Sequence, residues 1–369
     1  MRIALVITEL EPGGAEKCFV HLACFLKSRG HEVRVWLLHP APTSQRSQLI
    51  QQLDAIGIVW RSAGFTKPWQ FFSASRWLRA ELHGFAPDVV QSFLFHANVL
   101  SAVAVKNLAC RLFGGARVAQ PERWRQLAQR WASKRMQRLV CVSDSVAGQC
   151  QQHEKISPEK ICVIPNGIDL QSLDKDPQPC WTQLGLPAQA RVLLFVGRLT
   201  EQKGILDFVI RQATTVLEQL PEHHLVMIGA GEQELAIRQA LEKLPVAARV
   251  HLVGWQAAAI SWMGVAELLF LPARYEGMPN VVLETMAQSK PVVSFAVDGV
   301  GELLGTSAAA QSQLIPPGAW NEFGERIVKL ASDRAQQQRC GQENRQRVEQ
   351  FFQLKQQLAK YEQLYRVRS

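Results

Sequence analysis

Two glutamates, Glu276 and Glu284, lie eight residues apart on either side of a turn that contains Gly277 and Pro279. The apolar run at 268–272 before them is typical of a buried strand, and a helical pattern follows them. The first N–H groups of such a helix have no intrahelical partner, so its N-terminus is suited to a phosphate. Two isolated glutamates would be read as solvated surface acids. Their order after a buried strand instead favours a ligand with hydroxyls at both ends of a diphosphate, as in a nucleotide-sugar.

A second cluster follows another apolar run, at 192–196, which is typical of a buried parallel strand. Gly197 permits a close backbone approach, and Arg198 and Lys203 lie in the loop before a helical pattern at 205–220. Arg can hold a phosphate through two hydrogen bonds, and Lys acts as a point charge. A basic loop could simply be solvated, but together with the glutamates it indicates a diphosphate site.

These motifs resemble those of the retaining glycosyltransferases of family 4. The resemblance implies an α/β protein with the GT-B fold, in which two Rossmann-like α/β domains face a deep interdomain cleft. It covers nearly the whole chain, and the motifs come in the order of the family. The further matching segments are Gly13 to Glu16, Val142 to Ser145, Pro165 to Asp169, Gly229 to Glu232 and Val253 to Trp255.

The resemblance also implies roles for individual residues. Arg198 and Lys203 would neutralise the donor diphosphate, and Glu284 would hold the ribose hydroxyls. Glu276 would meet the donor sugar as a catalytic residue. The segment around Gly231 and Trp255 would border the base. Further donor contacts are implied for Gly14, Gly277, Met278, Asn280 and Val281.

His96 is the second catalytic residue that the resemblance implies. It stands between a buried strand and a helix, where it could bind a sugar hydroxyl or shape the charge near the reacting carbon. Some relatives carry His-x-His here, but Leu94 and Asn98 occupy the neighbouring positions of that pattern. A lone histidine is more often structural, so its role depends on the resemblance.

Gly13 and Gly14 lie between the first strand and a helix, and they could form a tight turn or approach a ligand. No Gly-x-Gly-x-x-Gly fingerprint is present. The family context favours a contact of Gly14 with the donor phosphate. Asp174-Lys175-Asp176 has the Asp-x-Asp pattern with which other glycosyltransferases hold a metal, but it lies in a proline-rich stretch. We therefore expect a solvated turn, no metal and no other cofactor.

The formal charge of +9 is carried by the first part of the chain. Residues 1–170 contain 21 Lys and Arg against 12 Asp and Glu, and the remainder contains 20 of each. Arg111 to Arg138 is the densest basic stretch, and Trp124, Leu127 and Trp131 recur within it at helical spacing. This apolar stripe could pack on the domain core, or it could belong to a surface that meets anionic lipid or an anionic glycolipid. No nucleic-acid motif accompanies the charge.

The chain alternates strand and helix patterns, which is typical of parallel sheets covered by helices. We predict an N-terminal acceptor domain at 1–166, a linker at 167–190, a nucleotide-sugar domain at 191–345 and a C-terminal helix at 346–369 that crosses back to the first domain. In the first half, strands are predicted at 2–8, 32–38, 88–92, 116–119, 139–142 and 161–164. No transmembrane helix is expected, and the eight cysteines show no metal-ligand spacing. The predicted location is the cytoplasm, with an option of peripheral attachment to the inner face of the membrane.

The sequence thus predicts a retaining hexosyltransferase. It would use a nucleotide-sugar, UDP-linked rather than GDP-linked, and a surface-glycan acceptor such as lipopolysaccharide core or a lipid-linked oligosaccharide. Segments 40–70 and 93–125 would select the acceptor. Two alternatives stay open: a nucleotide-sugar epimerase of related fold and a non-catalytic nucleotide-sugar-binding protein.

Overall fold

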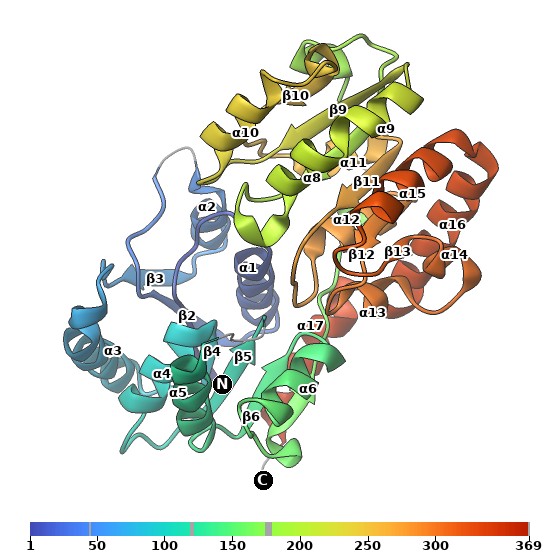
Figure 1. The fold of residues 1–369 in the computed structure, drawn as a ribbon. Coiled ribbons are helices and arrows are strands. Elements are labelled where there is room, and N and C mark those ends of the chain that lie inside the picture. Colours follow the sequence, from blue (N-terminus) through green and yellow to red (C-terminus); the bar gives the residue numbers. More distant parts are fainter. Residues whose placement is uncertain (44–45, 119–121, 174–178, 368–369) are drawn as a thin grey trace. The chain divides into compact units, whose positions relative to one another are not determined.

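The computed structural model describes residues 1–43, 46–118, 122–173 and 179–367. The chain divides into two compact units, each built around one parallel sheet (Figure 1). Met1–Gly167 and Leu354–Ser369 form the first unit, and Ile168–Gln353 forms the second. Both units alternate strand and helix, as the periodicity of the sequence predicts.

The first unit contains a parallel sheet of the order β3-β2-β1-β4-β5-β6-β7. Its strands are β1 (Arg2–Ile7), β2 (Glu32–Leu37), β3 (Val59–Ser62), β4 (Val89–Phe93), β5 (Arg111–Ala116), β6 (Arg138–Cys141) and β7 (Ile161–Val163). Its α-helices are α1 (Gly14–Ser28), α2 (Gln48–Ala55), α3 (Phe71–Phe85), α4 (Phe95–Ala104), α5 (Arg123–Ser133), α6 (Asp144–Gln152) and α17 (Leu354–Arg366). The apolar runs at β1 and β4 pair in parallel with Ile3 opposite Val89.

One predicted strand is misplaced, because β5 covers 111–116 rather than 116–119. Gly114 and Gly115 weaken the strand pattern of that segment, yet both are required by close packing. A Cβ on Gly115 would lie 2.9 Å from the carbonyl oxygen of Ser92, and one on Gly114 would lie 2.5 Å from the sulfur of Met136. Strand β3 has no counterpart among the predicted strands.

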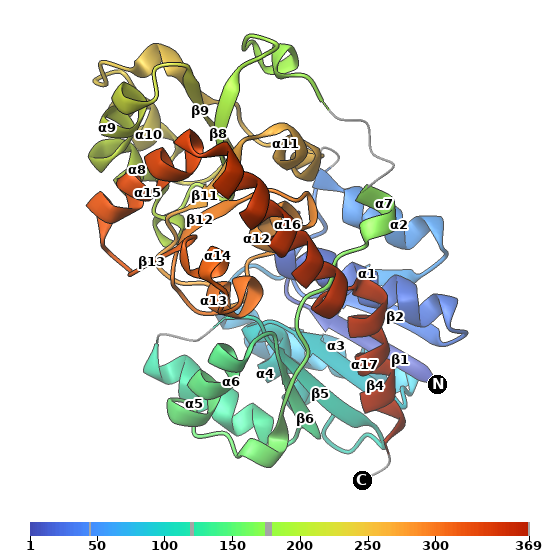
Figure 2. The same ribbon diagram turned by 90° about the vertical axis from the view of Figure 1, so that its right-hand side faces the viewer.

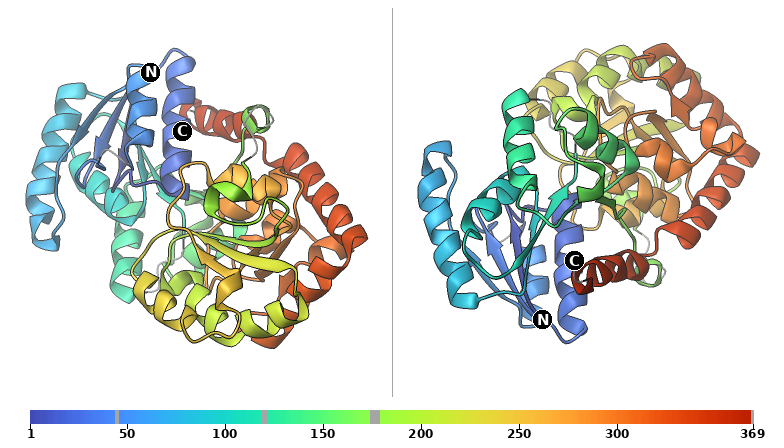
Figure 3. Two further views of the ribbon diagram at one scale, coloured as in Figure 1. Left: turned by 90° about the horizontal axis from the view of Figure 1, so that it is seen from above. Right: turned by 90° about the horizontal axis from the view of Figure 1, so that it is seen from below.

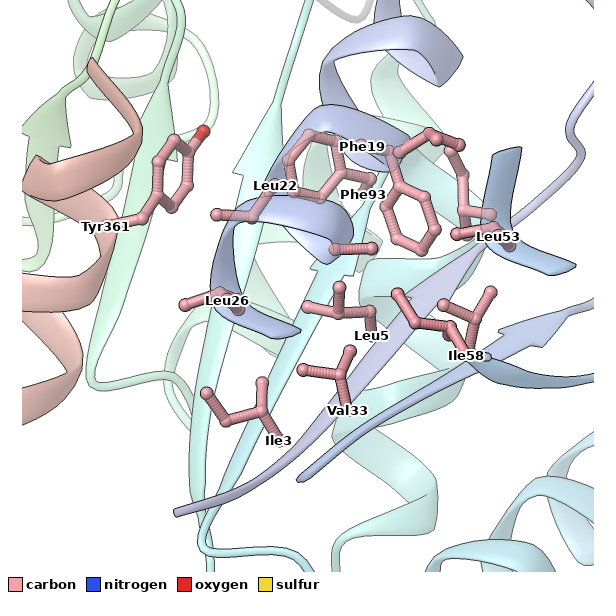
Figure 4. Close-up of a cluster of buried hydrophobic side chains, with 14 of the residues drawn as sticks. Ile3, Leu5, Phe19, Leu22, Leu26, Val33, Leu53, Ile58, Phe93 and Tyr361 are labelled. Atoms are coloured by element: carbon pink, nitrogen blue, oxygen red, sulfur yellow. The ribbon is translucent and has the colours of Figure 1, made fainter. Parts of the chain in front are cut away.

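The core of the first unit joins the sheet to α1, α2 and α17 (Figure 4). Phe19 of α1 and Phe93 of β4 meet edge to face with ring centroids 5.3 Å apart. Tyr361 and Tyr365 of α17 are buried in the same cluster. The Tyr365 hydroxyl donates a 2.9 Å hydrogen bond to Gln91 Oε1 inside the sheet. Figure 3 shows α17, in dark red, beside the blue α1.

The second unit contains a parallel sheet of the order β10-β9-β8-β11-β12-β13 (Figure 2). Its strands are β8 (Arg191–Val196), β9 (His223–Ile228), β10 (Val250–Leu252), β11 (Leu268–Leu271), β12 (Val292–Phe295) and β13 (Leu314–Ile315). Its α-helices are α7 (Leu170–Leu173), α8 (Ile205–Arg211), α9 (Ala213–Gln219), α10 (Glu234–Leu241), α11 (Ala259–Val265), α12 (Asn280–Ala287), α13 (Val300–Leu304), α14 (Ala308–Gln311), α15 (Trp320–Ser332) and α16 (Arg334–Phe351).

The segments between the two units differ in detail from the predicted ones. Part of the predicted linker packs on the second unit, where the Trp181 and Trp262 rings lie 5.0 Å apart. The predicted C-terminal helix is two helices, because α16 ends at Phe351 and α17 begins at Leu354. Asp174-Lys175-Asp176 lies outside the described residues. No helix in the described part of the chain combines the length and the apolar character that crossing a membrane requires.

Candidate functional site

The predicted donor residues follow four neighbouring strands of the second sheet. Arg198 and Lys203 follow β8, Gly231 follows β9, Trp255 follows β10, and Glu276 follows β11. Because these strands are parallel, their carboxyl ends share one edge, where ligands of open α/β sheets bind. Arg198 is exposed there and Trp255 is half-buried.

The loops after β8 and β11 are joined by an ion pair between Lys203 Nζ and Glu276 Oε1. The two side chains are only 12% and 8% exposed. Sequence reasoning assigned Lys203 to the diphosphate and Glu276 to the sugar, and it did not predict that they pair. Removing one partner of a buried pair strands the other charge away from water, which is costly. The pair therefore fixes both side chains at the same edge of the sheet.

Arg274 forms a second connection between these loops. Its guanidinium pairs with Glu201 and, at 2.8 Å, with Asp207, and both pairs raise its pKa. Its backbone N–H donates to the Gln202 carbonyl at 2.8 Å, and Gln202 Nε2 donates to the Tyr275 carbonyl at 3.0 Å. Sequence reasoning missed this role, because the partners are about seventy residues away and leave no local signal.

Three glycines allow the backbones of these loops to touch. Gly204 has φ +65, and a Cβ there would lie 2.1 Å from the Pro272 carbonyl oxygen. Gly229 has φ +149, and a Cβ there would lie 1.8 Å from the Gly197 carbonyl oxygen. Such contacts leave no room for a side chain. Gly231 is packed in the same way, because its Cβ would lie 2.4 Å from the Leu199 carbonyl oxygen.

Helix α12 continues directly from the Glu276 loop. Pro279 precedes its first residue, Asn280, and Val281 follows. Glu284 lies in the second turn and is half-buried. Gly277 and Met278 are buried between Glu276 and the helix. The two acids therefore lie before and within α12, with the first turn of that helix between them in the chain, as the sequence predicts.

In the first unit, His96 is the second residue of α4, directly beyond the carboxyl end of β4. Leu94 before it has φ +73, a conformation that non-glycine residues rarely adopt. Partial desolvation lowers the pKa of His96, and the charges of Arg125 and His39 lower it further, while Glu9 opposes them. His39 Nδ1 and Glu9 Oε2 are 3.3 Å apart. His39, Glu9 and Arg125 are neighbours of His96 that sequence reasoning did not name.

Gly14 is the first residue of α1 and is exposed. The preceding Gly13 leaves room for a carboxylate, since a Cβ there would lie 2.2 Å from Glu16 Oε2. Glu16 is in the first turn, where a negative charge is favourable. The Glu16 carboxylate therefore already places a negative charge at the N-terminus of α1. A contact of Gly14 with a phosphate stays a prediction.

The apolar stripe of α5 faces solvent. Trp124, Leu127 and Trp131 are 58%, 66% and 39% exposed, whereas Gln129 and Ala132 are buried on the opposite side. The alternative in which this stripe packs on the domain core is therefore wrong. The arrangement leaves a basic helix with an exposed aromatic face.

His96 and Gly14 belong to the first unit, and the other predicted site residues belong to the second. Within the described residues, no group of three or more His, Cys, Asp or Glu side chains is placed to hold a metal ion.

Two family models match the chain in succession. Residues 12–172 match Glycosyltransferase Family 4, and residues 190–333 match Glycosyl transferases group 1. A lipopolysaccharide core biosynthesis glycosyltransferase of Rhizobium meliloti, LpsD, is 24% identical over 287 residues, which cover 78% of this chain and 76% of LpsD. An Escherichia coli UDP-Gal:alpha-D-GlcNAc-diphosphoundecaprenol alpha-1,3-galactosyltransferase is 28% identical over 188 residues, 47% of each chain. In several curated relatives the match spans less than half of the relative's length.

The fold has solved counterparts over its whole length. HepE of Anabaena, in complex with UDP-glucose, superposes with a TM-score of 0.83 at 22% identity, covering 99% of this chain and 100% of HepE. This likeness and the two parallel sheets confirm the predicted GT-B fold class. The successive matches, the order of the motifs and the fold agree, and the chain belongs to glycosyltransferase family 4, with a group 1 glycosyl transferase domain as its second half.

Proposed function

We propose that the chain transfers a hexose-type sugar from a UDP-linked donor to a surface-glycan acceptor, with retention of configuration at the anomeric carbon. The observation that carries this proposal is the buried Lys203–Glu276 pair, held beside the start of α12 at the carboxyl edge of the second sheet. UDP-glucose in the HepE complex supports the choice of donor. The names of LpsD and of the galactosyltransferase support an acceptor such as lipopolysaccharide core or a lipid-linked oligosaccharide.

In this mechanism the second unit binds the donor through charge. Arg198 and Lys203 neutralise the diphosphate, and the positive N-terminal end of the α12 dipole favours its negative charge. The Lys203 ammonium has three N–H donors, so it can keep its bond to Glu276 while it binds a phosphate oxygen. Glu284 accepts from the ribose hydroxyls, and the segment around Gly231 and Trp255 borders the base. These groups stabilise the charge that develops on the departing nucleotide, without a metal ion.

The chemical step exchanges two bonds on one face of the sugar. The bond from the anomeric carbon to the diphosphate oxygen breaks, and a bond from that carbon to the acceptor oxygen forms. The acceptor hydroxyl proton passes to the departing phosphate oxygen. Glu276 orients the sugar through its hydroxyls and forms no covalent intermediate. His96 contacts the sugar as a neutral imidazole, which agrees with the downward direction of its pKa shift.

The first test is thermal unfolding of the full chain with UDP, GDP, ADP and dTDP and their common sugars, without metal. Stabilisation by one nucleotide-sugar beyond that of its bare nucleotide is the expected result. No stabilisation by any of them would contradict the proposal. Product analysis then separates the alternatives: donor conversion without an acceptor would indicate an epimerase, and binding without turnover would indicate a sensor.

We further propose that the protein works in the cytoplasm, at the inner face of the membrane, through α5. Trp124, Leu127 and Trp131 would enter the lipid interface, and the exposed Lys134 and Arg135 directly after α5 would meet anionic headgroups. Co-sedimentation with vesicles of phosphatidylglycerol, compared with phosphatidylcholine, tests this. Binding should be selective for the anionic vesicles, should weaken with salt, and should fall in a Trp124→Ala/Leu127→Ala variant. Equal binding by this variant and the parent would contradict the role of α5.

A further inference from the structure

A pocket of about 200 Å³ lies in the first unit beside the first turns of α5. Three cations line it, namely Arg123 and Arg130 of α5 and Lys155 after α6. Arg123 and Arg130 are both exposed, so their charges are available at the mouth. Glu154 supplies the carboxylate of the lining and is itself only 4% exposed. The pocket thus combines a cationic rim with one buried acid.

Glu154 also lines a second, smaller cavity of about 20 Å³. Leu94, Gly115 and Arg117 lie on that side, at the carboxyl ends of β4 and β5, together with Gln129 of α5. Glu154 is therefore a wall common to both cavities. It connects the basic pocket with the edge of the sheet at which His96 stands.

Two buried polar atoms in these walls have no hydrogen-bond partner among the described residues. They are Oε2 of Glu154 and Nε2 of Gln129, a residue that is 2% exposed. The other amide atom of Gln129, Oε1, accepts from Asn98 Nδ2 at 3.3 Å. A buried donor or acceptor without a partner is unfavourable, and a ligand that supplies the partner gains that energy on binding. Glu154 lines both cavities, whereas Gln129 lines only the smaller one, which has room for about one water molecule. The Glu154 carboxyl is therefore the buried polar group that can meet a hydroxyl of a ligand in the larger pocket.

The protonation of Glu154 fits this interpretation. Desolvation raises its pKa to about 7, against a hydrogen bond with Cys150 that lowers it. Near neutral pH the carboxyl group can therefore donate a hydrogen bond as well as accept one. This dual capacity suits the hydroxyls of a sugar better than it suits a bare cation.

We propose that the larger pocket forms a subsite for an anionic sugar, in which Glu154 binds a hydroxyl and Arg123, Arg130 and Lys155 bind a phosphate or carboxylate group. The inference deepens the proposed function, because it makes the glycan acceptor an acidic or phosphorylated one. The pocket belongs to the first unit, whereas the donor residues belong to the second.

The test measures binding to the full chain by calorimetry, without any donor. The probes are glucose, glucose 1-phosphate, glucuronate and inorganic phosphate. Glucose 1-phosphate or glucuronate should bind at least ten-fold more tightly than glucose or inorganic phosphate. Tighter binding of glucose 1-phosphate would indicate a site for a phosphate group, and tighter binding of glucuronate would indicate a site for a carboxylate. An Arg123→Ala/Arg130→Ala variant should lose at least ten-fold in that affinity, because both charges leave the rim.

Arg76→Ala is the matched control, since Arg76 is an exposed cation on α3, away from the pocket lining. Glu154→Gln should also weaken binding, and its folding is checked by thermal unfolding. The proposal is overturned if the double variant binds like the control, or if inorganic phosphate binds as well as the sugar anions. Failure of the proposed function is separate: it would appear as absent donor binding in the UDP panel while the sugar anion still binds.

Discussion

The carboxyl edges of the two sheets are built in opposite ways. In the second unit the loops after β8, β9 and β11 touch backbone to backbone, and the Lys203–Glu276 pair joins two of them. In the first unit, Leu94 adopts a rare backbone conformation, and one carboxylate oxygen of the buried Glu154 has no hydrogen-bond partner among the described residues. A site that binds one fixed group, a diphosphate, can be assembled in advance from paired charges. A site that selects among acceptors can keep a buried acid whose partner comes with the ligand.

The strongest test of this contrast breaks the buried pair in the second unit. Lys203→Met should lower the free energy of unfolding by about 3–5 kcal/mol, because the Glu276 carboxylate is left buried and unpaired. The double variant Lys203→Met/Glu276→Leu should recover most of that loss. Urea unfolding of the single and double variants measures both effects.

Activity separates the two roles of the pair. Sugar transfer and stabilisation by UDP should be lost in the double variant as well as in the single ones, even where stability returns. Recovery of transfer together with stability would mean that the pair only supports the fold.

The second test adds a methyl group at Gly229, where the loops after β8 and β9 come closest. Gly229→Ala should destabilise the protein by on the order of 4 kcal/mol, because overpacking and backbone strain add. Gly301→Ala is the matched control, since nothing lies within 4 Å of its Cβ position and its φ is not positive. Denaturant midpoints of the two variants should differ clearly. Similar midpoints would show that the loop after β9 can move away from Gly197.

The third test uses pH in the first unit. Because burial raises the pKa of Glu154 to about 7, the folded state favours the protonated carboxyl. Protonated Glu154 therefore stabilises the folded state fully below the ordinary glutamate pKa of 4.5, and this stabilisation is lost as the pH rises through about 7. The loss amounts to about 3 kcal/mol. Glu154→Gln should remove this slope in urea unfolding between pH 5 and pH 8. A slope of equal size in both proteins would contradict the assignment to Glu154.

The smallest effect concerns Leu94. Glycine adopts φ +73 freely, so Leu94→Gly should relieve strain while it loses packing, with a net change within about 1 kcal/mol. Leu112→Gly, at a buried strand position with no such strain, should cost several-fold more in thermal unfolding. Transfer activity should still fall in Leu94→Gly, because the start of α4 positions His96. Equal destabilisation by both substitutions would show that Leu94 stores no strain.

The parts that sequence could predict are those with local signals. Apolar runs followed by helical periodicity located most strands, and turn glycines next to charged residues indicated Arg198, Lys203, Glu276 and Glu284. Strand β5 was misplaced because Gly114 and Gly115 look like a turn until the neighbouring strands are packed against them.

Other features depend on contacts between distant segments. The Lys203–Glu276 pair and the Arg274 connection join residues about seventy positions apart. The periodicity of the sequence predicts the apolar stripe of α5. It does not predict which side of the helix packs against the sheet, so Trp124 could have been buried or exposed. The ligand-binding and catalytic roles of the site residues, Gly14 and His96 included, rest on family resemblance and stay predictions.

The position of α17 in the first core bears on the order of events during biosynthesis. Leu358, Tyr361 and Tyr365 complete a core whose other members lie in the first 167 residues. All of residues 168–353 leave the ribosome before this helix does. The apolar face of the first unit therefore stays uncovered until α17 has been synthesised. The second unit, which is continuous in the chain, can already fold by then. Ribosome-bound chains stalled before α17 should accordingly need a chaperone for their first half and not for their second.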